Sequence, residues 1–329
     1  MSALAPTLQA FFTDRLAGQK NASPNTIGGY RDSWRLLLRF ASQRTRTKPS
    51  GLDIADLDAP LIAAFLEHLE HDRHNSIRTR NNTLAAVHSL FSYAALRHPE
   101  HAASIQRVPA IPAKRHQRNL VSYLTQAELA ALLAACDTTT WTGRRDHAML
   151  LLAAQAGLRI SELTGLTIAD LTLGPGAHVH CTGKGRKERR TPLIAPTSSV
   201  LRRWLAERHG APADPLFPTS TGRRLSRDAV ERRIACYAAK ASNSCPSLRS
   251  KHVTAHTLRH TAAMQLLEAG NDITVIALWL GHEQVSTADI YIHADMSHKE
   301  RAIARIQPPG TKPGRYHPAD SLLAFLEAL

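Results

Sequence analysis

Residues that could hold and attack a phosphodiester gather near the C-terminus of this 329-residue chain, and two more lie upstream. Arginine and lysine supply positive charge, histidine supplies hydrogen bonds, and tyrosine supplies a hydroxyl nucleophile. The candidates are Arg159, Lys184, His256, Arg259, His282 and Tyr291. Fixed cations can stabilise the charge that develops when a phenol oxygen attacks phosphorus. These residue types therefore suggest phosphoryl transfer without a metal ion.

The stretch HTLRH at 256–260 predicts a helical turn that carries several of these groups. In a helix, His256, Arg259 and His260 lie along one side, because residues three and four apart are neighbours. Two histidines at this spacing could instead bind a metal ion or lie on the surface. The adjacent arginine would repel a divalent cation, and no third ligand follows at an obvious spacing. Metal binding is therefore the weaker interpretation.

Tyr291 follows His282 by nine residues, so their sharing a pocket depends on the chain between them. One continuous helix would place the two on opposite faces. Gly281 predicts the end of a helix that Asp272 begins, and Ser286 predicts a new helix start, which provides a break. A lone tyrosine is usually core filler, because an ordinary phenol has a pKa of about 10 and stays protonated. A nearby base and several cations are needed to favour the phenolate.

The two upstream candidates fall at the ends of predicted elements. An apolar helix over 144–156 stops at a glycine, so Arg159 lies in the turn that follows. Alternating residues at 178–182 and 190–194 flank turn glycines. This pattern predicts a β-hairpin with Lys184 at its tip.

The rest of the chain divides into two regions around a basic, proline-containing stretch. Amphipathic spacing predicts helices at about 24–41, 61–69 and 83–94, which form a small bundle. A capping box at 125–128 begins the first helix of the second region. The predicted boundaries are 1–108 for the helical domain, 109–119 for the linker, 120–307 for the second domain, and 308–329 for a tail with an apolar helix at about 319–329.

Bulk composition favours a nucleic-acid partner. The formal net charge is +14 and the pI about 10.2, with basic residues spread over both halves of the chain. Such a charge favours a polyanion, although a basic protein without one is the plain alternative. The four cysteines contain no C-x-x-C pair and predict reduced structural thiols. The sequence shows no signal peptide and no apolar run long enough for a membrane span, so we expect a soluble cytoplasmic, nucleoid-associated protein.

Taken in order, these blocks resemble the tyrosine recombinase (phage integrase) family over nearly the whole chain. AGLRISEL at 156–163 is similar to the family's first arginine box, and GKGRKER at 183–189 resembles its lysine hairpin. The H-x-x-R pair at 256–259, the G-H pair at 281–282 and the tyrosine nine residues later resemble the remaining motifs. One departure is Ala156, where many relatives have threonine. It should affect packing at the turn more than chemistry.

The resemblance implies a role for each candidate. Arg159 and Arg259 would clamp the phosphate, with Glu162 supporting the first arginine. Lys184 would protonate the leaving 5′ oxygen, with Lys187 as a weaker candidate. His256 would aid proton removal from the phenol, and His282 would donate to a phosphate oxygen. Tyr291 would be the nucleophile.

The resemblance also implies an architecture and a reaction. The fold would be mainly α with a small β-sheet: an N-terminal helical, SAM-like core-binding domain and a mixed α/β catalytic domain, which embrace duplex DNA. A 3′-phosphotyrosyl bond would store the energy for resealing, so neither ATP, a cofactor nor a divalent cation is implied. Strand exchange between specific sites would proceed in a tetramer through a Holliday junction. An accessory recombinase or DNA-bending protein could assist, and the helix at 319–329 could dock onto a neighbouring protomer.

Two other functions remain open from the sequence. A type IB topoisomerase uses closely similar groups to relax DNA, and an accessory protein could keep the clamp without turnover. The biological role could be integration, transposition or resolution of replicon dimers. Possible DNA contacts are Arg78, Arg80, Lys114, Arg115 and Lys187, although an exposed arginine is usually only solvated.

Overall fold

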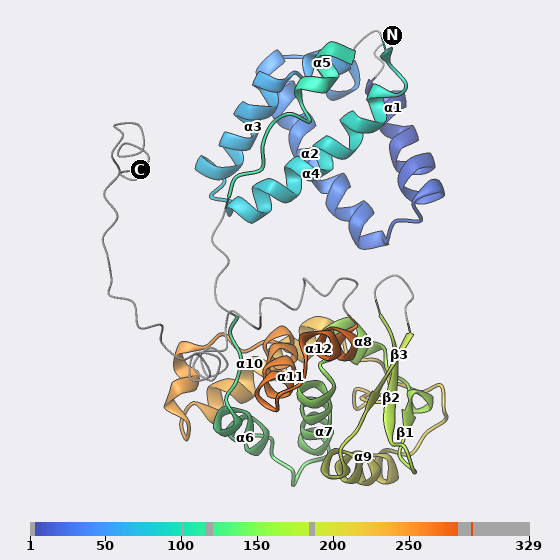
Figure 1. The fold of residues 1–329 in the computed structure, drawn as a ribbon, viewed down its shortest axis with the longest axis vertical. Helices are drawn as coiled ribbons and strands as arrows, with labels where there is room; N and C mark the ends of the chain where they lie inside the picture. The colour runs from blue at the N-terminus through green and yellow to red at the C-terminus, as the bar shows by residue number, and fades with distance from the viewer. Residues whose placement is uncertain (1–3, 100–101, 116–120, 184–187, 282–290, 292–329) are drawn as a thin grey trace, which may run out of the picture. The chain divides into compact units, whose positions relative to one another are not determined.

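The computed structural model describes residues 4–99, 102–115, 121–183, 188–281 and 291. The chain forms two compact units: the N-terminal unit, Met1–Arg118, and the C-terminal unit, Asn119–Leu329. Both are mainly helical, and the strands of the described chain lie in the C-terminal unit (Figure 1). The predicted fold class, mainly α with a small β-sheet, is confirmed.

The N-terminal unit is a helical bundle whose helices begin at side-chain caps. Ser23, Asp58 and Ser76 each accept a hydrogen bond from the backbone N–H three residues on, which satisfies one free donor of the first turn. The core between the helices is apolar and includes the fully buried Trp34 and Phe65. The elements are α1 Leu4–Ala10, the π-helix Phe11–Gln19, α2 Pro24–Thr45, the 3-10 turns Pro49–Gly51 and Ile54–Asp56, α3 Ala59–His71, α4 Ile77–Ala95 and α5 Ala102–Arg107.

The C-terminal unit packs helices around α7, with a three-stranded sheet on one side (Figure 1). Helix α7 contacts α11 and α9, and α10 contacts α6 and α8. The sheet is antiparallel in the order β1-β2-β3, with His180 opposite Arg190 at the centre of the longer pair. Its helices are α6 Gln126–Ala134, α7 Trp141–Ala156, α8 Ile160–Gly165, α9 Ala195–Arg208, α10 Arg227–Ala241, α11 Ala255–Glu268 and α12 Ile273–Leu280, and its strands are β1 Leu171–Thr172, β2 His178–Thr182 and β3 Glu188–Pro192.

Several predicted boundaries differ from the structure. Helix α4 begins at Ile77 rather than near 83, because the Ser76 side chain caps it. Helix α7 starts at Trp141 rather than 144, because the Thr140 hydroxyl caps it by accepting from the Gly143 N–H at 3.0 Å. The return strand of the hairpin spans Glu188–Pro192 rather than 190–194, because Ile194 is already the N-cap of α9. The hairpin itself is confirmed by the β2–β3 pairing. Its tip and the predicted helix at 319–329 lie outside the described residues.

The first part of the predicted linker is attached to the N-terminal unit. Asn81 accepts a hydrogen bond from the Lys114 backbone N–H at 3.1 Å and donates to the Lys114 carbonyl at 2.8 Å. The Lys114 ammonium pairs with Glu70 at 2.9 Å. These contacts hold the backbone to the N-terminal unit as far as residue 114. The linker at 109–119 remains a prediction.

No helix in the placed part of the chain combines the length and the apolar character needed to cross a bilayer.

Candidate functional site

Arg159 lies at the start of α8, immediately after the sharp turn that ends α7. Its own backbone N–H donates to Glu162 Oε2 at 2.8 Å, and its Nη1 donates to Glu162 Oε1 at 2.8 Å. Its Nη2 donates to the Gly281 carbonyl at 3.1 Å. One carboxylate therefore holds both the backbone and the side chain of Arg159, and 30 % of that side chain remains exposed.

Glu162 is buried and shared between two arginines. Arg189 in β3 donates to both its carboxylate oxygens, from Nη1 at 3.0 Å and from Nη2 at 2.8 Å. Burial by itself would raise the pKa of Glu162, but the hydrogen bonds and charge of Arg189, together with the hydrogen bonds of Arg159, hold this pKa below the ordinary value. The carboxylate is therefore charged at neutral pH and fixes two guanidinium groups.

Arg259 is buried in α11 and joins the ends of two other helices. Its Nη1 donates to the Gly157 carbonyl at 2.6 Å, and its Nη2 donates to the Leu280 carbonyl at 2.8 Å. Gly157 is the C-cap of α7, and Leu280 is the last residue of α12. Carbonyls at a helix C-terminus lack partners within the helix and carry partial negative charge. They therefore hold a buried cation in place.

Gly157 and Gly281, the glycines that end α7 and α12, both adopt the left-handed backbone conformation. Gly157 has φ +62°, and a Cβ there would lie 2.5 Å from the Leu280 Cδ2. Gly281 has φ +64°, and a Cβ there would lie 3.0 Å from Nη1 of Arg189. A side chain at either position would strain the backbone and displace a neighbour at the site.

Tyr291 reaches the same region from the far end of the described chain. It is 1 % exposed and packs in an apolar cluster with Met264 and Leu280. Its burial raises the pKa to about 12, although the charges of Arg259 and Arg159 act in the opposite direction. The phenol is therefore within the electrostatic reach of both arginines, and it is protonated at neutral pH.

Among the described residues, His260 contacts the Tyr291 hydroxyl. Its Nδ1 lies 3.1 Å from that oxygen. His256, to which the family resemblance gives proton removal from the phenol, is exposed, and its ring centroid lies 4.2 Å from that of His260. His260 thus contacts both the ring of His256 and the phenol of Tyr291.

The site is electropositive. The guanidinium groups of Arg159, Arg189 and Arg259 lie around one carboxylate, which leaves a formal charge of 3 − 1 = +2. Burial lowers the pKa of Arg259 to about 10, and the charge of Arg159 adds to this, yet Arg259 remains a cation at neutral pH. The Cys181 thiol lies within the electrostatic reach of these groups, and burial raises its pKa to about 11. A protonated thiol is a poor nucleophile. The arrangement suits the binding of a phosphodiester.

The structure therefore brings together Arg159, Glu162, Arg259 and Tyr291, which are far apart in the sequence. Lys184, Lys187 and His282 lie outside the described residues. Within the described part of the chain, no three metal-ligating side chains group as a candidate metal site.

The candidate DNA contacts of the N-terminal unit differ in exposure. Arg78, Lys114 and Arg115 are exposed. Arg80 is only 5 % exposed, and its Nη1 donates to the Pro112 carbonyl at 3.2 Å. Its Nε also lies 3.4 Å from Glu70. The Arg80 guanidinium thus holds the polypeptide near the predicted linker, a placement that argues against direct contact with a phosphate.

Sequence reasoning gave no role to two residues of the site. Arg189 lies in the basic hairpin segment, but its partner Glu162 is 27 residues away, so no local spacing indicates the pair. His260 was grouped with its helical neighbours by spacing, yet its contact with Tyr291 spans 31 residues. The available signal for His260 was its position directly after Arg259.

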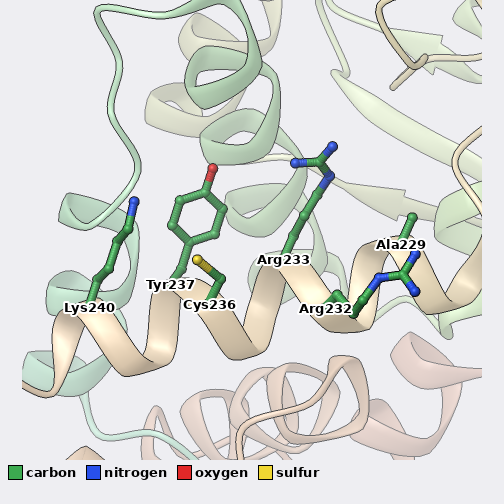
Figure 2. Close-up of a pocket in the computed structure, with 6 residues that line it drawn as sticks. All are labelled: Ala229, Arg232, Arg233, Cys236, Tyr237 and Lys240. Carbon is green, nitrogen blue, oxygen red and sulfur yellow. The ribbon is translucent and has the colours of Figure 1, made fainter.

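A separate basic hollow of about 300 Å³ lies along α10. Figure 2 shows the residues that line it, which are Ala229, Arg232, Arg233, Cys236, Tyr237 and Lys240. The Tyr237 hydroxyl donates to Asp146 Oδ2 at 2.8 Å, and Arg233 donates to the same oxygen at 3.2 Å. The buried Asp146 therefore already binds two of the lining groups. The predicted catalytic residues that the structure describes, Arg159, His256, Arg259 and Tyr291, do not line this hollow.

Comparison with known proteins identifies the chain's relatives. Residues 122–298 match the model of the phage integrase family, and residues 10–98 match the model of the phage integrase N-terminal SAM-like domain. A protein of Sinorhizobium fredii that carries the name integrase/recombinase y4rC is 53 % identical over 100 % of this chain and 99 % of its own length. The tyrosine recombinase XerC of Pelobacter propionicus is 31 % identical over 95 % of this chain and 99 % of its own.

Solved structures show the same fold. The XerH site-specific recombinase bound to a palindromic difH substrate, in a post-cleavage complex, matches with a TM-score of 0.68 and 25 % identity, over 88 % of this chain and 82 % of that chain. The Tn1549 transposon integrase in complex with transposon right end DNA matches with a TM-score of 0.69 and 18 % identity, over 91 % and 99 % of the two chains.

Proposed function

Since this chain belongs to the phage integrase family of tyrosine recombinases, a family of DNA strand-exchanging enzymes, we propose that it recombines DNA at specific sites through a covalent bond to Tyr291. The observation that carries the proposal is the meeting of Tyr291 with Arg159 and Arg259 in one buried, electropositive site. These residues come from three separate segments. Their convergence supports a phosphate clamp around a nucleophile.

In the proposed reaction, the two arginines bind the non-bridging oxygens of the scissile phosphate. The planar guanidinium suits this task because it can donate to two oxygens at once. The Tyr291 oxygen attacks phosphorus and loses its proton, the bond from phosphorus to the 5′ oxygen breaks, and Lys184 protonates the leaving oxygen. His282 donates to a phosphate oxygen, His256 aids proton removal from the phenol, and Glu162 orients Arg159.

Rejoining reverses these steps with the 5′ hydroxyl of a partner strand. The 3′-phosphotyrosyl bond conserves the phosphodiester energy, so the proposed cycle uses neither ATP nor a metal ion. Two rounds within a tetramer would exchange both strand pairs through a Holliday junction. Such a cycle serves integration, transposition or dimer resolution, with an accessory recombinase or DNA-bending protein where assembly requires one. Duplex DNA as substrate would keep the protein with the nucleoid in the cytoplasm.

DNA binding is proposed to use both units. Arg78, Lys114 and Arg115 are exposed cations of the N-terminal unit, and Lys187 belongs to the lysine hairpin. Contacts of this kind bind phosphates and carry no base specificity by themselves. The XerH relative was solved on its difH substrate, which supports duplex DNA as the ligand.

The experiment that tests the proposal traps the covalent intermediate. A duplex nicked just beyond the cleavage position releases the short 5′-hydroxyl fragment after attack, so the protein stays attached to DNA. Mass spectrometry of the nuclease-digested adduct should find the nucleotide on Tyr291. Tyr291→Phe should abolish the adduct and leave DNA affinity within a few-fold, since one hydroxyl is lost from a phosphate-dominated interface.

The matched control is Tyr316→Phe, which removes the next tyrosine in the sequence and should trap normally. An adduct on another residue, or normal trapping by Tyr291→Phe, would refute the assignment. Relaxation of a supercoiled plasmid of arbitrary sequence, without recombination between two sites, would indicate a topoisomerase instead.

A further inference from the structure

The Tyr291 hydroxyl contacts His260, one residue beyond the buried Arg259. The distance from His260 Nδ1 to the phenol oxygen is 3.1 Å, and the two rings meet edge to face, with centroids 5.5 Å apart at 66°. The distance is that of a hydrogen bond between a ring nitrogen and a hydroxyl. His260 therefore touches the atom that attacks phosphorus in the proposed reaction.

Helix α11 holds His260 rigidly. Thr254 and Thr257 form a capping box at its start. One turn later, the Thr261 hydroxyl donates to the Thr257 carbonyl at 2.9 Å and accepts from the Leu124 backbone N–H at 2.9 Å. Arg259 on the same turn is fixed by two helix ends. The backbone that carries His260 is thus held in place by buried contacts next to the clamp.

The phenol needs a base because the site keeps it neutral. Tyr291 is 1 % exposed, and its burial raises the pKa to about 12. Attack by the neutral hydroxyl would leave a proton on the oxygen that bonds to phosphorus. A base within hydrogen-bond reach removes that proton as the new bond forms. His260 lies at that distance.

We propose that His260 is the catalytic base for Tyr291. In cleavage, the proton moves from the phenol oxygen to Nδ1 of a neutral His260 that carries its own hydrogen on Nε2. The bond from the phenol oxygen to phosphorus forms, the bond from phosphorus to the 5′ oxygen breaks, and the leaving oxygen takes its proton from Lys184. In rejoining, the imidazolium returns its proton to the departing phenolate. The inference rests on the proposed function and adds a residue to it.

The groups around His260 and Tyr291 affect the proton transfer. The His256 ring lies one turn before His260 on the same helix, with ring centroids 4.2 Å apart. Tyr123 packs against the same apolar cluster as Tyr291. Arg259 and Arg159 act on the phenol from α11 and from the start of α8, and both favour the phenolate. The arginines thus stabilise the phenolate that the transfer produces.

The first test replaces the base with a neutral acceptor. Asparagine at 260 can place an amide oxygen near the Nδ1 position, so it keeps a hydrogen bond but accepts no proton. His260→Asn should slow formation of the covalent adduct about 10²- to 10⁴-fold, the usual contribution of a positioned base. His260→Gln should show a similar loss. The matched control is His252→Asn, on an exposed histidine outside the site, which should cleave like the wild type.

The second test separates the nucleophile from the leaving group. A substrate with sulfur in place of the bridging 5′ oxygen has a leaving group that needs no proton. This substrate should restore cleavage by Lys184→Ala but not by His260→Asn. An unfolding curve like that of the wild type and a DNA affinity within a few-fold of it show that a variant is folded. If His260→Asn does not fold, His260→Gln is used in its place.

The outcomes are distinct. Wild-type cleavage rates in both His260 variants, or rescue of His260→Asn by the sulfur substrate, would overturn the base assignment while the adduct on Tyr291 still forms. Absence of any Tyr291 adduct with the wild-type protein would instead overturn the proposed function.

Discussion

Arg189 and Glu162 form a bidentate ion pair that joins strand β3 to helix α8. Both terminal nitrogens of the arginine donate to the carboxylate, at 3.0 and 2.8 Å. The Arg189 side chain is 10 % exposed and that of Glu162 is 2 % exposed. The same carboxylate holds Arg159. The position of the first phosphate clamp therefore depends on β3, the return strand of the hairpin.

Removing Arg189 should destabilise the C-terminal unit. Arg189→Met leaves the buried carboxylate with one partner fewer, and breaking a buried pair in this way typically costs about 3 to 5 kcal/mol. Tryptophan fluorescence during urea unfolding can measure the loss, since Trp141, Trp204 and Trp279 all lie in this unit. Arg190→Met is the control: Arg190 is exposed, and the change should stay within about 0.5 kcal/mol. Equal effects of the two substitutions would contradict a special role for the pair.

Stability should fall in acid through the same carboxylate. The pKa of Glu162 is held below its ordinary 4.5 in the folded protein, so the folded state favours the charged form. That contribution is fully present above pH 4.5 and is lost as the pH drops through the lower, folded-state pKa. The urea concentration at the midpoint of unfolding should therefore decrease as the pH is lowered from about 4.5. Glu162→Gln should show a shallower fall, with the remainder coming from groups such as Glu128, whose pKa is also lowered. An unchanged pH dependence in Glu162→Gln would remove Glu162 as a cause.

Gly157 should tolerate no side chain. Its φ of +62° costs an alanine about 1 to 2 kcal/mol, and the contact of 2.5 Å with Leu280 adds about 1 to 3 kcal/mol of overpacking. Gly222 provides a matched control, because it has φ +78° with nothing within 4 Å of a Cβ. Gly222→Ala should show the backbone cost alone in urea unfolding. Gly157→Ala should also slow cleavage, since the Gly157 carbonyl binds Arg259. Equal losses of stability in the two variants would mean that the Leu280 contact relaxes freely.

Local patterns predicted much of the scaffold. Thr125 and Asp272 cap helices where the sequence placed them, because a cap involves residues only two or three apart. Gly157 and Gly281 end α7 and α12 as predicted, since both positions need a left-handed backbone. The turn that presents Arg159 follows from the same local rule.

Contacts between distant segments were beyond local patterns. The pairing of Arg189 with Glu162 depends on how the hairpin packs against α8, and neither periodicity nor capping encodes that packing. The contact of His260 with Tyr291 depends on where the chain beyond α12 returns to α11. Arg80 illustrates the opposite difficulty: its type suggested a DNA contact, whereas its burial could be recognised only from the folded bundle. Tertiary packing decided each of these roles.

The two clamp arginines should respond differently to lysine. Arg259 donates to two carbonyls on different helices, and a single ammonium cannot reproduce the two directions of that planar fork. Arg259→Lys should therefore slow adduct formation and also lower the urea midpoint. Arg159 is less buried, and its carboxylate partner keeps Arg189, so Arg159→Lys should slow cleavage with a smaller change in stability. Each variant should lose roughly 10²- to 10³-fold in cleavage rate, by analogy with one missing oxyanion donor. Single-turnover cleavage at saturating protein separates this loss from weaker DNA binding. If Arg159→Lys proved the more destabilising variant, the structural role assigned to Arg259 would be wrong.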